Sequence, residues 1–164
     1  MKKVYIMRHA KSSWDHPNLS DYERPLNNRG LADAPMMGEI FKKLDIKPEL
    51  IISSSAKRAI TTARIVAEKM GYPPDKIMQE KKIYTEADKG ILKIINRVDN
   101  RLQSVMIVGH NPILTSLVNK LSDYGLSNLP TAAMAAIEFD VDDWQAIAPG
   151  VGKVVYFEYP KKYK

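Results

Sequence analysis

Five short apolar runs alternate along the chain with segments in which apolar residues recur every three or four positions. Short apolar runs favour buried strands, whereas the longer recurrence is the periodicity of an amphipathic helix. Strands separated by helical segments are typical of an α/β fold. The predicted strands are residues 3–7, 50–53, 104–108, 134–139 and 154–159.

The segments with helical periodicity cover residues 34–44, 59–70, 91–102 and 114–121. Pro35 predicts a kink or a restart early in the first of them, because proline has no N–H and its ring clashes with the preceding turn. Three stretches follow neither pattern, at residues 10–28, 71–88 and 125–133. Loops of that length in a compact domain are usually functional or mobile.

The chain has no cysteine and only three histidines, His9, His16 and His110. The absence of cysteine excludes disulfides, thiol catalysis and cysteine-based metal sites. No two histidines stand four residues apart, which argues against a zinc site on a helix. We therefore expect neither a metal nor a cofactor.

The formal net charge of +6 indicates anionic partners. The basic residues are spread along the chain among acidic ones, and the one dense cluster, residues 161–164, is expected to be a solvated tail. Nucleic-acid binding calls for a focused basic face with stacking aromatics, so no nucleic-acid partner is expected. No run is long enough to cross a membrane and no secretion signal is visible, which predicts no membrane contact and a cytoplasmic location. The length of 164 residues favours one domain, residues 1–164.

The first apolar run ends on Arg8-His9, with Lys11 two residues further along. Nearby positive charges disfavour the imidazolium, so Arg8 and Lys11 are expected to hold the pKa of His9 below its usual value of about 6.5. A neutral imidazole among cations is suited to attacking or binding an anion.

Cations or imidazoles follow three of the predicted strands, at residues 8–9, 53–58 and 109–111. In open α/β sheets, ligands gather beyond the carboxyl ends of the strands. Two of these junctions also begin helices, whose free N–H groups and dipole favour an anion. The three junctions are therefore expected to meet at one edge of the sheet.

Taken singly, none of these side chains indicates a function. A lone histidine is more often structural than nucleophilic, and most arginines are solvated or ion-paired. Together, Arg8, His9, Arg58 and His110 predict a pocket for a doubly charged oxyanion such as a phosphoryl group. Arginine forks match phosphate geometry, and imidazoles add donors or a nucleophile.

Other chemistries lack their motifs in this chain. There is no glycine-rich P-loop, no Gly-x-Ser-x-Gly elbow and no dinucleotide fingerprint after the first strand. No pair of carboxylates indicates a glycosidase.

The ordered set of motifs resembles the histidine phosphatase superfamily, also called the phosphoglycerate mutase-like fold. It consists of Arg8-His9, residues 53–63 (Ser-Ser-Ser-Ala-Lys-Arg-Ala-Ile-Thr-Thr-Ala) and residues 108–112 (Val-Gly-His-Asn-Pro). Residues 21–30 (Asp-Tyr-Glu-Arg-Pro-Leu-Asn-Asn-Arg-Gly) are similar to the SixA-type branch, the phosphohistidine phosphatases. The resemblance implies a three-layer α/β/α sandwich with a mostly parallel central sheet and no cap insertion.

The resemblance also implies roles for the convergent residues. His9 is expected to be the nucleophile, which takes the phosphoryl group to form a phosphohistidine intermediate that water hydrolyses. Arg8, Arg58 and His110 are expected to bind the phosphoryl oxygens and to stabilise charge in the transition state.

The chain departs from the family pattern in two places. Many relatives have a glycine and an acidic residue after the Arg-His pair, where this chain has Ala10 and Lys11, and Lys11 is expected to attract anionic substrates. Larger relatives supply a carboxylate that protonates an oxygen leaving group. The candidates for that general acid here are Glu80 and Glu86, which are equally well explained as exposed loop residues.

Three residues near the candidate site carry weaker expectations. Arg24 and Arg29 are expected either to contact the substrate or to hold the long first loop through ion pairs. Two roles are open for Trp14, in the same loop: it lines the entrance of the site together with His16, or it anchors the loop on the core. Anchoring is expected, as large apolar rings commonly pack in this way.

The weak signal for a general acid favours cleavage of a P–N bond, since an imidazole leaves phosphohistidine without a positioned acid, unlike an alkoxide. We therefore expect a metal-independent phosphatase acting on protein phosphohistidine. Two alternatives stay open: a phosphatase for small phosphate esters, and a binding module for phosphorylated ligands without catalysis. The sequence leaves the oligomeric state open.

Overall fold

The computed structural model describes residues 1–164, which build one six-stranded sheet with helices on both faces. The strands are β1 (Lys2–Arg8), β2 (Leu50–Ser53), β3 (Met78–Gln79), β4 (Ser104–Gly109), β5 (Met134–Phe139) and β6 (Lys153–Glu158). Their order is β3-β2-β4-β1-β5-β6, and β5 alone runs antiparallel to its neighbours. The mostly parallel sheet is confirmed, and each of the five predicted strands ends within one residue of its predicted bounds.

Strand β3 was not predicted, because it lies inside the stretch 71–88 that has no clear periodicity. Its two residues pair in parallel with Ile52 and Ser53 of β2 and are both exposed. Two exposed residues at the edge of a sheet leave no alternation of apolar and polar positions for a sequence pattern to detect.

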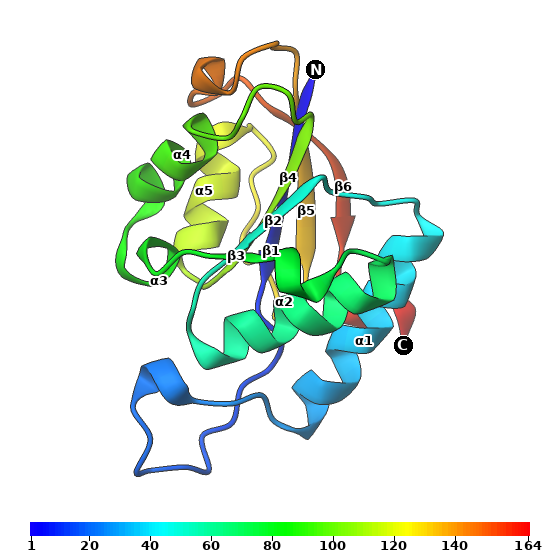
Figure 1. Cartoon of the computed structure of the whole chain (residues 1–164), viewed down its shortest axis with the longest axis vertical. Coiled ribbons are helices and arrows are strands. Elements are labelled where there is room, and N and C mark those ends of the chain that lie inside the picture. Colours follow the sequence, from blue (N-terminus) through cyan, green and yellow to red (C-terminus); the bar gives the residue numbers. More distant parts are fainter.

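Helices form the two outer layers of the fold (Figure 1). They are α1 (Asn28–Lys43), α2 (Lys57–Met70), α3 (Lys82–Thr85), α4 (Asp88–Asn96) and α5 (Ile113–Leu121), with short 3-10 turns η1 (Asp21–Glu23), η2 (Pro74–Lys76), η3 (Trp144–Ala146) and η4 (Pro160–Tyr163). Figure 1 shows α1 and α2 on one face of the sheet and α4 and α5 on the other. The three-layer α/β/α architecture is therefore confirmed.

Two apolar cores, one on each face of the sheet, hold the layers together. Successive side chains of a strand point to opposite faces, so Val4 and Ile6 of β1 join one core while Tyr5 and Met7 join the other. Burial on both faces explains why β1 reads as a continuous apolar run.

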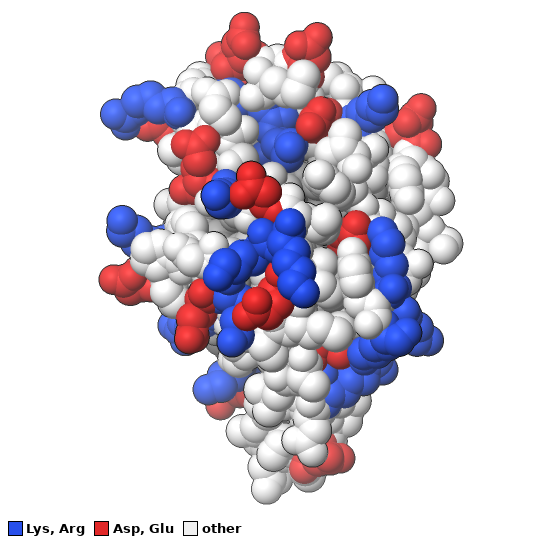
Figure 2. All heavy atoms as spheres, turned by 90° about the vertical axis from the view of Figure 1, so that its right-hand side faces the viewer, with Lys and Arg blue, Asp and Glu red and all other residues white.

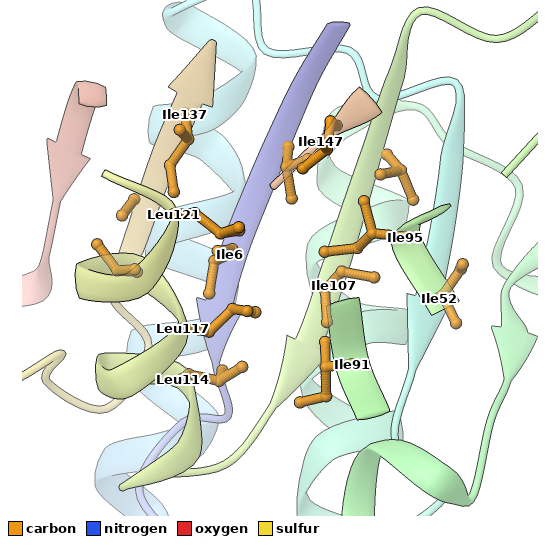
Figure 3. Close-up of a cluster of buried hydrophobic side chains, with 14 of the residues drawn as sticks. Ile6, Ile52, Ile91, Ile95, Ile107, Leu114, Leu117, Leu121, Ile137 and Ile147 are labelled. Carbon is orange, nitrogen blue, oxygen red and sulfur yellow. The ribbon is translucent and has the colours of Figure 1, made fainter. Parts of the chain in front are cut away.

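The core under α4 and α5 shows how the helical periodicity meets the sheet (Figure 3). Leu117 and Leu121 of α5 face Ile6 of β1, and Ile91 and Ile95 of α4 lie against Ile107 of β4. All six are buried. Removing the side chain of one such leucine or isoleucine typically costs about 2–5 kcal/mol of stability.

The predicted restart at Pro35 is wrong, because α1 is one continuous helix that contains this proline. The helix begins at Asn28, where the side chain of Asn27 accepts a hydrogen bond from the Gly30 N–H at 2.9 Å. Pro35 has no N–H to donate, so only the carbonyl of Leu31 loses its hydrogen bond within the helix. Leu31 is half exposed, and its carbonyl can accept a hydrogen bond from water instead.

Helix α4 ends earlier than its periodicity predicts. It stops at Asn96, although Val98 and Leu102 still pack against the same core. The Asp99 side chain accepts a hydrogen bond from the Arg101 N–H at 2.9 Å, which stabilises a turn in place of the predicted helix.

The C-terminal tail is anchored rather than solvated as predicted. Lys162 pairs with Glu158 at 3.0 Å, and Lys164 pairs with Asp33 of α1 at 2.8 Å. Both carboxylates are buried, so these two ion pairs hold η4 against the body of the protein.

Candidate active site

The three polar junctions meet at one edge of the sheet, as predicted. Strands β2, β4 and β1 are parallel neighbours, so their carboxyl ends lie side by side. Arg8 ends β1 with His9 directly after it, His110 follows β4, and Arg58 lies in the first turn of α2. These four residues line one cavity of about 430 Å³.

Hydrogen bonds from both neighbouring segments fix the backbone around His9. Its N–H donates to the Gly109 carbonyl and its carbonyl accepts from the Ala132 N–H, both at 3.0 Å. The Ala10 N–H donates to the Thr62 hydroxyl, also at 3.0 Å, which ties this turn to α2. The imidazole is therefore held on a rigid support.

The ring of His9 has one defined tautomer in its neutral form. Nδ1 lies 2.6 Å from the Ala10 carbonyl oxygen. A carbonyl only accepts hydrogen bonds, so Nδ1 carries the proton and Nε2 keeps its lone pair. That arrangement leaves Nε2 as the nucleophilic atom.

Burial is the main reason that His9 stays neutral. Burial, together with smaller contributions from the positive charge of His110, Arg58 and Arg8, lowers the pKa of His9 to about 3, while the bond to Ala10 opposes the shift. We predicted Arg8 and Lys11 as the cause. Arg8 contributes, Lys11 is not among the leading causes, and desolvation outweighs every single charge.

His110 lies beside His9, with 5.3 Å between the two ring centroids. Its Nε2 is 2.8 Å from the hydroxyl oxygen of Ser54, and burial together with Arg58 lowers the pKa of His110 to about 4. At neutral pH both rings are uncharged, so all fixed positive charge around His9 comes from lysine and arginine.

Two buried polar atoms of the site have no hydrogen-bond partner, namely Nε of Arg8 and Nδ1 of His110. Leaving a buried polar atom unpaired costs about 1–3 kcal/mol, so proteins rarely do it without a functional reason. The remainder of the Arg8 guanidinium is fixed by a 3.1 Å bond from Nη1 to the Leu129 carbonyl. An oxyanion bound in the cavity would supply acceptors for these atoms.

Asp21 is a member of the site that sequence reasoning missed. Its carboxylate pairs with Arg58 and with Arg24, both at 2.9 Å, and accepts a 2.8 Å bond from the Tyr84 hydroxyl. Partial burial opposes ionisation, but these hydrogen bonds outweigh it and lower the pKa of Asp21 to about 2. Asp21 is therefore an ionised positioning group for Arg58.

The signals for Asp21 and Tyr84 are weak in the sequence. Asp21 stands in the stretch 21–30 that carries the resemblance, three residues before Arg24, yet nothing local indicates its contact with Arg58. Tyr84 packs edge-on against both Tyr22 and His110.

Asp21→Asn is expected to lower kcat by about tenfold, because the amide no longer pairs with the two guanidinium groups that it orients. Steady-state kinetics of the purified variant measure this, with Asp15→Asn as the control in the exposed part of the same loop. A variant faster than wild type would show instead that Asp21 competes with the phosphoryl group for Arg58.

Arg24 holds the long loop and lines the cavity as well. Its Nε donates to the Ser13 carbonyl at 3.0 Å, Nη1 pairs with Asp21, and Nη2 bonds the Ser12 hydroxyl. The guanidinium also lies 3.4 Å from the ring centroid of Trp14.

The predicted anchoring of Trp14 on the core is wrong, because its side chain is 74% exposed. The indole covers the Arg24 guanidinium at the rim of the cavity instead, in a cation–π contact.

The remaining candidates divide into those at the cavity and those away from it. Lys11 lines the cavity, whereas Arg29 lies outside it and pairs with Asp33 at 3.6 Å. Neither Glu80 nor Glu86 is among the lining residues, and Glu80 accepts a bond from the Lys82 N–H. The geometry therefore gives no support to either glutamate as a general acid.

No group of three or more His, Asp or Glu side chains is placed to hold a metal ion. None of the helices has the length and apolar character that crossing a membrane requires.

Because two histidines are buried in the neutral form, we expect the free energy of unfolding to fall as the pH is lowered. Their pKa values in the folded protein, about 3 for His9 and about 4 for His110, lie below the value of about 6.5 expected in the unfolded chain. Below about pH 6.5 the unfolded chain therefore binds more protons, so the free energy of unfolding falls toward pH 4.

Urea unfolding of wild type and His110→Asn between about pH 7.5 and 5 measures this effect. The variant is expected to lose less stability over that interval, because one of the two neutral imidazoles is gone. Equal pH slopes for the two proteins would contradict the assignment.

The comparison with known proteins agrees with this geometry. The family model of the histidine phosphatase superfamily (branch 1) matches residues 4–82. An uncharacterized chloroplastic protein of Arabidopsis thaliana is 27% identical over 152 residues, which cover 88% of this chain and 69% of that protein.

Two solved structures share the fold over nearly the whole chain. A SixA protein of Agrobacterium tumefaciens is 26% identical with a TM-score of 0.83, covering 97% of this chain and 98% of that one. The protein histidine phosphatase SixA complexed with tungstate is 22% identical with a TM-score of 0.84, covering 99% of both chains.

Proposed function

The chain belongs to the histidine phosphatase superfamily and to its SixA-type branch, and we propose that it removes the phosphoryl group from phosphohistidine on a protein. The observation that carries this proposal is the geometry of His9. Its Nδ1–H is committed to the Ala10 carbonyl, which leaves the lone pair of Nε2 free among cations. The proposal takes residues 1–164 as one domain, because both apolar cores rest on the same sheet.

The reaction proceeds in two displacements on phosphorus. Nε2 of His9 attacks the phosphorus atom, and the P–N bond to the substrate imidazole breaks. That imidazole leaves with the electron pair and takes a proton from solvent. A water oxygen then attacks the phosphorus, the bond to Nε2 breaks, and phosphate leaves after the water has given up a proton. The chain ends the cycle unchanged.

The side chains around His9 stabilise both displacements. The bond from Nδ1–H to Ala10 strengthens as Nε2 becomes bonded to phosphorus and the ring grows positive. Arg8, Arg58 and His110 donate to the equatorial oxygens of the transferring group, where charge accumulates.

We propose phosphohistidine rather than a phosphate ester as the substrate because of the carboxylates at the cavity. Asp21 is the one Asp or Glu that lines the cavity, and its pKa of about 2 keeps it ionised at neutral pH. It has no proton to give to an alkoxide, and general acid catalysis is worth about 10²–10⁴ in rate. An imidazole leaves without that help. The fold shared with a protein histidine phosphatase complexed with tungstate, an oxyanion, also supports the proposal.

The substrate class is tested by comparing kcat/KM for a phosphohistidine-bearing carrier protein and for glycerol phosphate, an alkyl ester whose alkoxide leaving group depends on a general acid. We expect the carrier to be favoured by at least about 100-fold, the lower bound for a missing general acid. The opposite preference would keep the histidine mechanism and move the substrate to small phosphate esters. Phosphate binding without any turnover would leave only a binding module.

A further inference from the structure

A second cavity, the cationic groove, opens beside the catalytic one. It has a volume of about 390 Å³, in the size range of ligand sites, and it shares Arg8, Lys11 and Thr131 with the catalytic cavity. Arg29 and Lys161 complete its set of cations. None of its nine lining residues is an aspartate or a glutamate.

The anchored tail is what brings Lys161 to the groove. Of the three tail lysines, Lys162 and Lys164 are tied to buried carboxylates, while Lys161 has no ion-pair partner. Lys11 has no ion-pair partner either. Two ammonium groups thus face one groove without a counter-charge, although acidic residues are common elsewhere on this surface. On the face in Figure 2, which carries the C-terminal end of the chain, basic groups are bordered by acidic ones.

The kind of ligand follows from the kind of cation. Ammonium groups on flexible stems attract carboxylates without fixing a geometry, whereas a second phosphate calls for arginine forks. Neither arginine of the groove is free for a second phosphate, because Arg8 also lines the catalytic cavity, where it serves the transferring group, and Arg29 pairs with Asp33. The exposed Trp14 at the rim adds an aromatic surface of the type that anchors protein partners.

We propose that the cationic groove binds an acidic segment of the phosphorylated protein, next to the histidine that enters the catalytic cavity. The inference rests on the proposed function and names its partner: a protein whose phosphohistidine is flanked by glutamate or aspartate. Lys161, from the opposite end of the chain to His9, is then a specificity residue of the site. Such charges mainly raise the association rate and select the partner.

Two synthetic peptides of equal length test this, one with glutamates and one with glutamines around a central histidine. Titration calorimetry of the unphosphorylated peptides with the full chain measures binding without turnover. We expect the glutamate peptide to bind about tenfold more tightly, a difference that corresponds to about 1.4 kcal/mol. The preference shrinks with salt, because the Debye length falls from about 10 Å at 0.1 M to about 3 Å at 1 M.

Lys161→Glu is expected to abolish the preference for the glutamate peptide. The matched control is Lys93→Glu, an exposed lysine without an ion pair on α4, which packs on the opposite face of the sheet. Equal binding of both peptides by wild type, or an unchanged preference in Lys161→Glu, would overturn the groove proposal.

Turnover of the same peptides after phosphorylation separates this inference from the proposed function. A Lys161-dependent preference in binding, with no phosphate released from either phosphopeptide, supports the groove and counts against the phosphohistidine substrate. Phosphate release from both peptides at equal kcat/KM, without a binding preference, supports the substrate and rejects the groove.

Discussion

His9→Ala is expected to lower kcat/KM by at least about 10⁴-fold, because alanine removes the nucleophile on which both displacements depend. The loss should appear in kcat, since the cations that bind the phosphoryl group stay in place. The variant should therefore still bind inorganic phosphate as a competitive ligand. Steady-state kinetics and phosphate titration of the same preparation measure the two effects separately.

His16→Ala is the matched control, because it removes an exposed histidine of the same loop that does not line the catalytic cavity. Its kcat/KM should stay within about twofold of wild type, as for most surface substitutions. Full activity in His9→Ala would mean that water attacks the substrate directly and that His9 only binds.

Arg58→Ala is expected to lower kcat/KM by about 10³-fold, since arginine contacts to a transferring phosphoryl group are worth about 10³–10⁵. Arg58 is buried at the cavity and directed by Asp21, so its guanidinium is fixed before the substrate arrives. Arg58→Lys should recover little, because an ammonium cannot make two parallel bonds to two phosphoryl oxygens.

Arg64→Ala, on the exposed side of the same helix, controls for the loss of one positive charge. The comparison with Asp21→Asn decides what Arg58 does. If Arg58 served only to hold the loop at Asp21, the two variants would lose the same activity. A loss in Arg58→Ala about 100-fold greater than in Asp21→Asn follows from direct contact with the phosphoryl group.

The convergence of the catalytic residues could be predicted because it depends on local patterns and one rule of topology. Each apolar run marks a strand, and parallel strands end at the same edge. That rule alone predicts the positions of Arg8, His9 and His110, since each directly ends or follows a strand. Predicting the position of Arg58 also requires knowing where the helix after β2 begins.

The contacts that complete the site could not be predicted, because they join residues far apart in sequence. Asp21 reaches Arg58 and Tyr84 across 37 and 63 positions, and no local pattern records such a pairing. Lys161 lies in the groove because Asp33 and Glu158 anchor the tail through Lys164 and Lys162. The sequence alone shows only a basic cluster, which is equally compatible with a solvated tail. The predicted anchoring of Trp14 on the core failed for a similar reason, because its partner, Arg24, is ten residues away and charged.

The pKa of His9 illustrates the same limit. Charges next to it in the sequence predict the right direction, but the larger cause is burial, which depends on the packing of three segments around the ring.

The central claim is that Nε2 of His9 carries the phosphoryl group during turnover, and rapid-quench mass spectrometry tests it most directly. Wild-type protein mixed with a phosphohistidine-bearing carrier, and quenched at alkaline pH, should gain the mass of one phosphoryl group, mapped to the peptide that contains His9. The adduct should form and decay as fast as phosphate is released, and it should be missing from His9→Ala but present in His16→Ala. Turnover without any adduct on His9, or with an adduct on His110 instead, would contradict the claim.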